Sequence, residues 1–160
     1  MRVAVYPGSF DPITLGHLDI IGRAAAVFDH VVVGVLINPR KSPAQDVEAR
    51  AAVIREAVDD SLGELSARVE IVTFDGLTVD LALRRDAGFI VRGLRAISDF
   101  ESELQMAHTN RKLAPQVDTV FFMTSIEYAY LSSSLIREIA SFGGDVSGMV
   151  PKAVLRQLRG

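Results

Sequence analysis

Short apolar runs alternate with helix-like runs along the whole of this sequence, and this order strongly constrains its fold. Five runs favour strands because they are short, rich in β-branched residues and bounded by turn residues: residues 2–6, 30–37, 68–74, 89–92 and 118–124. Helical spacing fills the intervals, at residues 15–28, 47–62, 77–86, 98–113 and 133–142. Alternating strands and helices form parallel sheets with helices on both faces. The sequence therefore predicts a doubly wound, Rossmann-like α/β fold with a five-stranded parallel sheet.

Length, charge, cysteine content and the apolar runs limit the class of protein to which this chain can belong. Residues 1–160 contain no linker or low-complexity tract, so we expect a single domain, ending in a short helix at 151–159 that Pro151 opens. The formal net charge of -3 argues against nucleic-acid or anionic-membrane partners. Cysteine is absent, so no disulfide is expected, and no apolar run approaches the ~20 residues of a membrane span. We expect a cytoplasmic protein.

Polar clusters follow four of the expected strands, at residues 8–17, 38–41, 92–95 and 124–137. A parallel sheet brings the carboxyl ends of its strands to one edge, where ligands bind in folds of this kind. The clusters supply cations, hydroxyls and glycines. Two of them lie at expected helix N-termini, where N–H groups attract phosphate. Their coincidence predicts a site for phosphorylated ligands.

Each candidate residue also has a simpler interpretation when it is taken alone. An isolated histidine such as His17 is usually a surface or core residue, and Lys41 fits a solvated loop equally well. A helix cap alone would account for the serines at 132–134, and Arg137 points either at the site or at solvent. The place of His17 near a helix N-terminus favours function, because an imidazole there can donate a hydrogen bond to a phosphate.

Several catalytic patterns are absent from the sequence. There is no P-loop, no G-x-G-x-x-G after the first strand, no Gly-x-Ser-x-Gly elbow and no His/Cys metal cluster. No arrangement of serine, cysteine or histidine indicates a covalent nucleophile. We therefore expect no metal site built by the protein, and chemistry that depends on positioning and electrostatic stabilisation.

Four stretches resemble one enzyme family, in order and over nearly the whole chain. YPGSFDPITLGH (6–17) resembles the nucleotidyltransferase signature in its T-x-G-H form, with Thr14 where relatives often have a histidine. VRGLRAISDFESELQMAHTNRKL (91–113), YLSSSLIRE (130–138) and GGDVSGMVP (143–151) resemble the bacterial phosphopantetheine adenylyltransferases. The first stretch indicates only the superfamily, whereas the others indicate the pantetheine branch.

The resemblance implies a reaction and its partners. ATP and 4'-phosphopantetheine would give dephospho-coenzyme A and pyrophosphate, with Mg²⁺ accompanying the ATP. It also implies a homohexamer with coenzyme A as a feedback inhibitor.

The resemblance also implies roles for individual residues. His17 would stabilise the transition state, and Lys41 and Arg95 would join it in catalysis by screening the repulsion between two anionic reactants. Ser9, Lys41, Thr78 and Arg92 would hold phosphopantetheine. ATP would be bound by Ser9, Phe10, His17, Gly93, Leu94, Arg95, Glu103, Tyr128, Ala129, Tyr130, Leu131, Ser132, Ser133 and Ser134.

Two alternative functions stay open at this point, and the sequence departs from the family pattern at two places. The chain could be a nucleotidyltransferase for another acceptor, such as glycerol phosphate or nicotinate mononucleotide. It could also be a flavodoxin-like nucleotide-binding module without catalysis. After Lys41 the family often has an aromatic residue and a Ser/Thr-x-x-Glu-Arg run, where this chain reads SPAQDVEAR and keeps clearly only Arg50. Ser102 stands where a tyrosine is common.

Lys41→Ala is expected to impair use of the phosphorylated acceptor more than use of ATP, because Lys41 lies in the NPRK loop after the second strand. Steady-state kinetics with each substrate varied in turn measures this effect. Normal turnover together with normal Michaelis constants for both substrates would show that Lys41 has been misassigned.

Overall fold

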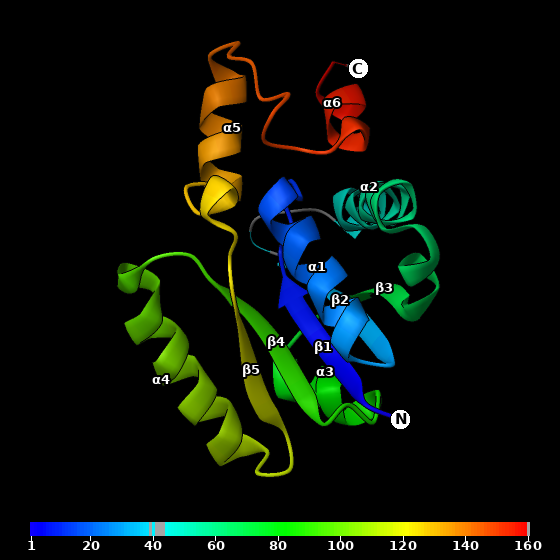
Figure 1. The fold of residues 1–160 in the computed structure, drawn as a ribbon, viewed down its shortest axis with the longest axis vertical. Helices are drawn as coiled ribbons and strands as arrows, with labels where there is room; N and C mark the ends of the chain where they lie inside the picture. The colour runs from blue at the N-terminus through cyan, green and yellow to red at the C-terminus, as the bar shows by residue number, and fades with distance from the viewer. Residues whose placement is uncertain (39, 41–43, 160) are drawn as a thin grey trace.

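Five parallel strands form the centre of the molecule in a computed structural model that describes residues 1–38, 40 and 44–159. The strand order is β3-β2-β1-β4-β5 (Figure 1). The strands are β1 (Val3–Gly8), β2 (His30–Leu36), β3 (Val69–Phe74), β4 (Phe89–Leu94) and β5 (Asp118–Met123). This sheet confirms the fold class predicted from the alternating pattern.

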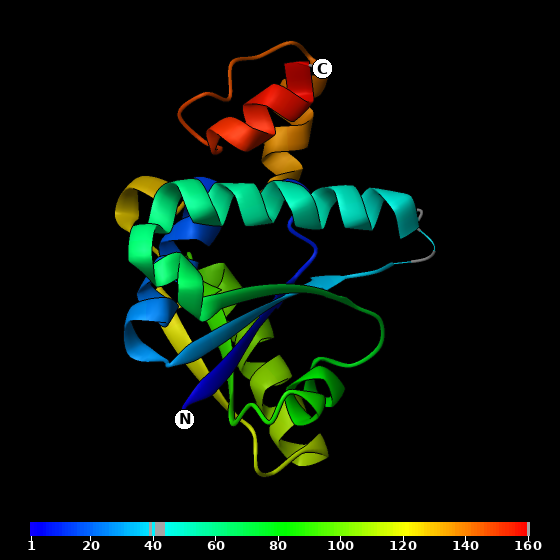
Figure 2. The same ribbon diagram turned by 90° about the vertical axis from the view of Figure 1, so that its right-hand side faces the viewer.

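Helices cover both faces of the sheet. The α-helices are α1 (Leu15–Val27), α2 (Ala44–Leu62), α3 (Thr78–Arg84), α4 (Ile97–Leu113), α5 (Ser133–Ser141) and α6 (Lys152–Arg159). Helices α1 and α2 lie on one face, and α3 and α4 lie on the other (Figure 1). Figure 2 shows α2 running across the sheet, with α6 on the far side of α2. None of the helices in the described part of the chain is long and apolar enough to cross a membrane.

Some element boundaries differ from the sequence prediction. Helix α2 begins at Ala44, earlier than the expected start at residue 47, and β4 continues through Leu94 instead of ending at residue 92. The last helix begins one residue after Pro151, whose carbonyl accepts hydrogen bonds from the N–H groups of Val154 and Leu155. Two short 3₁₀ segments, η1 (Gly63–Arg68) and η2 (Ile126–Tyr128), were not predicted.

The two central strands are apolar along nearly their whole length because both of their faces are buried. In β2, Val31 and Val33 belong to the core beneath α1 and α2, and Val32 belongs to the core beneath α3. Burial on both faces explains why the strands read as continuous apolar runs instead of alternating ones.

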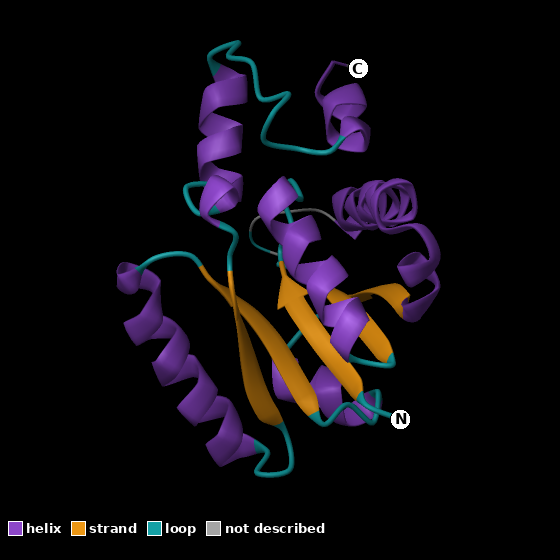
Figure 3. Cartoon of the chain, viewed as in Figure 1, coloured by secondary structure: helices purple, strands orange, loops and turns teal. Residues whose placement is uncertain are grey.

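After the last strand and α5, a loop carries the chain over to α6 (Figure 3).

Helix α3 approaches β2 closely at Gly34. A Cβ atom built there would lie 2.6 Å from Cδ2 of Leu81 and 3.0 Å from Cε1 of Phe74. Both neighbours are buried, so a methyl group at this position forces one of them to move. The absence of a side chain at Gly34 therefore sets how near α3, which begins at Thr78, can come to the sheet.

Gly34→Ala is expected to lower the free energy of unfolding by about 1–3 kcal/mol, because the added methyl overpacks this contact. Denaturant unfolding measures the change. Gly88→Ala is the matched control, since a Cβ at Gly88 meets no heavy atom within 4 Å and should cost less than about 0.5 kcal/mol. Equal stability of the two variants would show that the α3 contact is not tightly packed.

Candidate active site

A cavity of about 540 Å³ opens beyond the carboxyl ends of β1 and β4. Its walls come from the loop after β1, the first turn of α1, the N-terminal half of α4 and the connection from β5 to α5. We call it the main cavity. Most of the residues predicted for the site line it: Ser9, Phe10, His17, Arg92, Gly93, Arg95, Glu103, Tyr128, Leu131, Ser132, Ser133 and Ser134.

The remaining predicted residues lie elsewhere. Thr78 lines a second cavity of about 260 Å³, which shares Arg92, Glu103 and the last two residues of β1, Pro7 and Gly8, with the main cavity. Leu94, Ala129 and Tyr130 belong to neighbouring parts of the same elements but line neither cavity. Lys41 lies outside the described residues. The structure thus brings together three of the four predicted clusters, those at 8–17, 92–95 and 124–137, whereas Asn38 and Arg40, the described residues of the cluster at 38–41, do not line the main cavity.

The loop after β1 is held in a strained conformation. Phe10 has a φ of +46°, a left-handed conformation that costs a residue with a Cβ about 1–2 kcal/mol. Phe10 as a whole is only 2% exposed, and its ring packs edge-on against the rings of Tyr6 and His17, with centroids 5.3 and 5.0 Å away. This burial holds the strained backbone in place.

Arg50 anchors the same loop from α2, a role that the sequence did not suggest. Its Nη1 donates to the carbonyl of Ser9 at 3.1 Å, and its Nη2 lies 3.7 Å from the carboxylate of Asp11. The guanidinium is nearly buried. Arg50 therefore ties the loop after β1 to the helix that follows the Lys41 segment, across 41 positions of sequence.

His17 lies in the first turn of α1 and completes its cap. The N–H of Thr14 donates to Nδ1 of His17 at 3.0 Å, while the N–H of His17 donates to Oγ1 of Thr14 at 3.3 Å. A histidine here takes the place that Glu or Gln holds in the usual capping box. Because a backbone N–H can only donate, Nδ1 must be the acceptor. The neutral ring therefore carries its proton on Nε2.

The surroundings of His17 keep its ring uncharged. Burial and, next, the positive charges of Arg95 and Arg92 lower the pKa of His17 to about 4. At neutral pH the ring is a neutral donor in the wall of the main cavity. Among the described residues, no partner accepts a hydrogen bond from Nε2, so this proton is available to a ligand.

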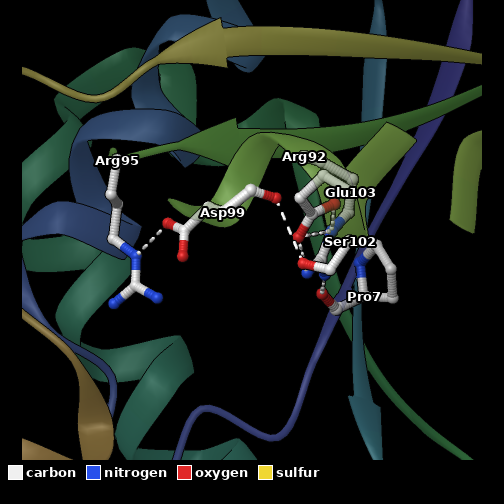
Figure 4. Close-up of polar contacts among 6 residues, drawn as sticks. All are labelled: Pro7, Arg92, Arg95, Asp99, Ser102 and Glu103. Atoms are coloured by element: carbon white, nitrogen blue, oxygen red, sulfur yellow. Dashed lines mark hydrogen bonds and ion pairs between the residues drawn. The ribbon is translucent and has the colours of Figure 1, made fainter. Parts of the chain in front are cut away.

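Arg92 is held at the wall between the two cavities (Figure 4). Its Nε and Nη2 donate to the carboxylate of Glu103 at 3.0 and 2.6 Å, and its Nη1 donates to the carbonyl of Pro7 at 2.9 Å. Burial opposes the charge of Arg92, but the hydrogen-bonded carboxylate of Glu103 raises the pKa of the guanidinium above its ordinary value. Glu103 therefore acts here as the partner of Arg92.

Arg95 has a different arrangement, with one nitrogen left over. Its Nε donates to Asp99 at 3.1 Å and its Nη1 donates to the carbonyl of Leu131 at 2.7 Å (Figure 4 shows the Asp99 contact). Within the described residues, Nη2 has no hydrogen-bond partner. Two fixed nitrogens orient the guanidinium, and the third is left for an anion in the main cavity.

The three serines mostly hold structure instead of forming a cradle of free hydroxyls. Ser132 caps α5 by accepting from the N–H of Leu135, and Ser133 donates its hydroxyl to the carbonyl of Pro12 at 2.8 Å. The hydroxyl of Ser134 accepts from Arg137, which also donates to the carbonyl of Asp11. Anion binding at this place therefore depends on the backbone N–H groups at the start of α5.

Comparisons with known proteins agree with this geometry. The family model described as "Cytidylyltransferase-like" matches residues 5–139. The chain is 53% identical to a phosphopantetheine adenylyltransferase of Lachnoclostridium phytofermentans, over 98% of this chain and 93% of the relative. It is 55% identical to one of Gloeobacter violaceus, over 98% and 94%. A solved structure assigned provisionally as a nicotinate-nucleotide adenylyltransferase of Vibrio parahaemolyticus shares the fold, with a TM-score of 0.69, 16% identity and coverage of 99% and 94%.

The lowered pKa of His17 predicts a pH dependence of stability. The unfolded chain takes up the proton near pH 6.5 and the folded chain only near pH 4, so stability falls as the pH drops through this window. One such proton contributes a slope of at most about 1.4 kcal/mol per pH unit. Denaturant unfolding of wild type and His17→Asn from pH 7 to 4 isolates this slope.

The exposed His108 on α4 provides the control, because His108→Asn also removes one histidine. This control variant should follow the wild-type curve. A constant difference in stability between wild type and His17→Asn across the whole pH range would contradict a buried neutral ring.

Proposed function

The chain belongs to the phosphopantetheine adenylyltransferases, and from this membership we infer that it transfers the adenylyl group of ATP to 4'-phosphopantetheine. The products are dephospho-coenzyme A and pyrophosphate, so the enzyme serves coenzyme A synthesis. The observation that best supports the assignment is that His17 and Arg95 line one cavity, which shares Arg92 and Glu103 with a second cavity.

The reaction is an in-line displacement at the α-phosphorus of ATP. An oxygen of the acceptor's phosphate forms the new bond to phosphorus, the bond to the β-phosphate oxygen breaks, and the electron pair leaves with pyrophosphate. The site needs no covalent nucleophile for this step. Its task is to position two anions and to stabilise the charge that develops between them.

We assign ATP to the main cavity and the acceptor to the second one. The second cavity combines apolar side chains, such as Leu36, Phe74 and Met106, with the polar Thr78 and Asn110. A pantetheine arm has the same mixture of methyl groups and amides. Arg92 borders both cavities and would therefore face the acceptor's phosphate where that phosphate meets ATP.

Two donors would act where charge changes. The neutral Nε2–H of His17 would donate to a non-bridging oxygen of the α-phosphate, and Arg95 would contact the phosphates through Nη2. Both are fixed before the substrates arrive, by Thr14 in one case and by Asp99 and Leu131 in the other. Donors that need no reorientation contribute most to lowering a barrier.

Mg²⁺ would enter with ATP instead of residing in the protein. No group of three or more His, Cys, Asp or Glu side chains among the described residues is placed to hold a metal ion. The carboxylates of Asp99 and Glu103 are occupied by arginines. Protein sites commonly hold Mg²⁺ through substrate phosphates and few side chains, and the ion would neutralise part of their charge.

The family also suggests an assembly and a regulator, which we propose here: a cytoplasmic homohexamer inhibited by coenzyme A. Exposed apolar side chains support an assembly of copies. Phe100, Met106 and Leu113 of α4 are 51%, 55% and 54% exposed, and Met123 at the end of β5 is 66% exposed. Light scattering would test the hexamer, and inhibition assays with coenzyme A would test the regulator.

The function is tested by measuring pyrophosphate released from ATP in the presence of each acceptor. We expect release with 4'-phosphopantetheine, little release with glycerol phosphate or nicotinate mononucleotide, and loss of release when a chelator removes Mg²⁺. Faster release with another acceptor would reassign the substrate. ATP binding without release for any acceptor would instead favour a non-catalytic module.

Two substitutions at His17 separate its role as a hydrogen-bond donor to ATP from its role in the cap of α1. In His17→Gln the amide reaches the position of Nε2 and can donate there, whereas in His17→Asn an oxygen replaces Nδ1 and keeps the bond from Thr14. We expect His17→Asn to lower kcat roughly 10²–10³-fold with ATP affinity nearly unchanged, because a transition-state donor is lost. His17→Gln should retain more kcat but lose stability.

Steady-state kinetics, ATP titration and thermal unfolding measure these effects together. If the two variants lose kcat equally and in proportion to their loss of stability, His17 serves the cap and not the chemistry.

A further inference from the structure

The segment that joins β5 to α5 forms one wall of the main cavity, and both apolar and polar contacts hold it. We call residues 124–131 the wall segment; Thr124, Tyr128 and Leu131 of this segment line the cavity. Leu131 is buried and Tyr128 packs against the core, but Ile126, the first residue of η2, is 94% exposed. Hydrophobic packing therefore holds the later part of the wall segment and leaves Ile126, near its start, without an apolar anchor.

Asp19 of α1 provides a polar anchor for this segment. Its Oδ2 accepts the hydroxyl of Ser125 at 2.9 Å and lies 3.4 Å from the Ser125 nitrogen, whose N–H points to it. Ser125 is the residue that precedes η2, so this contact fixes where η2 begins. The side chain of Asp19 is only 19% exposed, which shields the contact from water.

Arg23 reinforces the same anchor from the next turn of α1. Its Nη1 lies 3.3 Å from Oδ2 of Asp19 and also donates to the carbonyl of Met123, the last residue of β5. The guanidinium lies over the ring of Phe122, 5.4 Å from its centroid. Asp19 and Arg23 together thus grip both the end of β5 and the start of η2.

The wall segment also rests directly on the first turn of α1. A Cβ built on Gly16 would lie 3.5 Å from Cβ of Tyr128 and 3.7 Å from its carbonyl oxygen. One helix therefore carries His17 in the cavity and, two residues on, the carboxylate that holds the wall segment. The separation of the catalytic donor and the wall is set within a single rigid element.

We propose that Asp19 is a positioning residue: it holds the wall segment at the distance from His17 that productive ATP binding requires. The proposal rests on the assignment of ATP to the main cavity. Reacting groups need placement within a fraction of an ångström, and a misplacement of about 1 Å can cost 10²-fold in rate. A carboxylate that accepts from the wall segment supplies this constraint through Ser125 without touching the substrate.

Four single variants, and the double variant Asp19→Ala/Ser125→Ala, test the proposal. Asp19→Ala removes the anchor, Ser125→Ala removes its partner, and Asp19→Asn keeps an oxygen that can accept from Ser125. Asp59→Ala is the matched control, because Asp59 also pairs with an arginine four residues away, Arg55, on the distant helix α2.

We expect Asp19→Ala to raise the Michaelis constant for ATP about tenfold and to leave that for phosphopantetheine within about twofold. Ser125→Ala should show the same selectivity, and the double variant should be no worse than Asp19→Ala, because Ser125→Ala removes a bond that Asp19→Ala already removes. Asp19→Asn should recover most of the ATP affinity, and Asp59→Ala should resemble wild type. Equal losses for both substrates, or additive effects in the double variant, would overturn the proposal.

Two measurements keep this test separate from the proposed function. Calorimetric ATP titration without acceptor should show the same tenfold loss, and hydrogen exchange of amides 124–131 should accelerate in Asp19→Ala but not in Asp59→Ala. If wild type binds ATP but releases no pyrophosphate with phosphopantetheine, the function fails while these readouts still judge Asp19. If wild type is active and Asp19→Ala leaves both readouts unchanged, the positioning role fails alone.

Discussion

The reciprocal cap between Thr14 and His17 is the contact on which the chemistry of the site depends, because it starts α1 and sets the protonation of the His17 ring. A helix begins at the edge of the sheet and leaves N–H groups that need acceptors. The chain meets this need with an imidazole instead of a carboxylate, and the choice has a chemical result. Accepting through Nδ1 assigns the ring proton to Nε2, and burial beside two arginines keeps the ring neutral. The same bond that starts α1 therefore creates a donor that faces the main cavity.

Charge in the site is balanced before any ligand arrives. Arg92 lies in β4 and Arg95 directly follows it. Helix α4 brings a carboxylate to each of them. The two arginine side chains are 34% and 41% exposed, and each carboxylate offsets the charge of its arginine and holds it in place without substrate. The pairs also fix their directions: Arg92 stands between the two cavities, and Arg95 keeps one nitrogen for the main cavity. This arrangement suits a reaction in which two anions must approach each other.

The sequence predicted the features that depend on short-range patterns. The five parallel strands, the helix positions and the gathering of His17, Arg92 and Arg95 at one edge follow from periodicity and from the geometry of parallel sheets. The pattern could not predict contacts that join distant positions, such as Ser125 with Asp19, because no local signal marks such pairs. It also could not show that the hydroxyl of Ser133 is used for a structural bond, since a serine in a cap and a serine on a ligand look alike.

The partition formed by Arg92 and Glu103 has a consequence for turnover. In the assignment proposed above, each reactant would occupy one side of it, whereas dephospho-coenzyme A, a single molecule, would extend across both. Joining two ligands removes the entropic cost of holding them separately, so the joined molecule binds more tightly than either half. The product would then bind more tightly than either substrate. Its release past Arg92 and Glu103, and not the bond change at phosphorus, would limit turnover in such an enzyme.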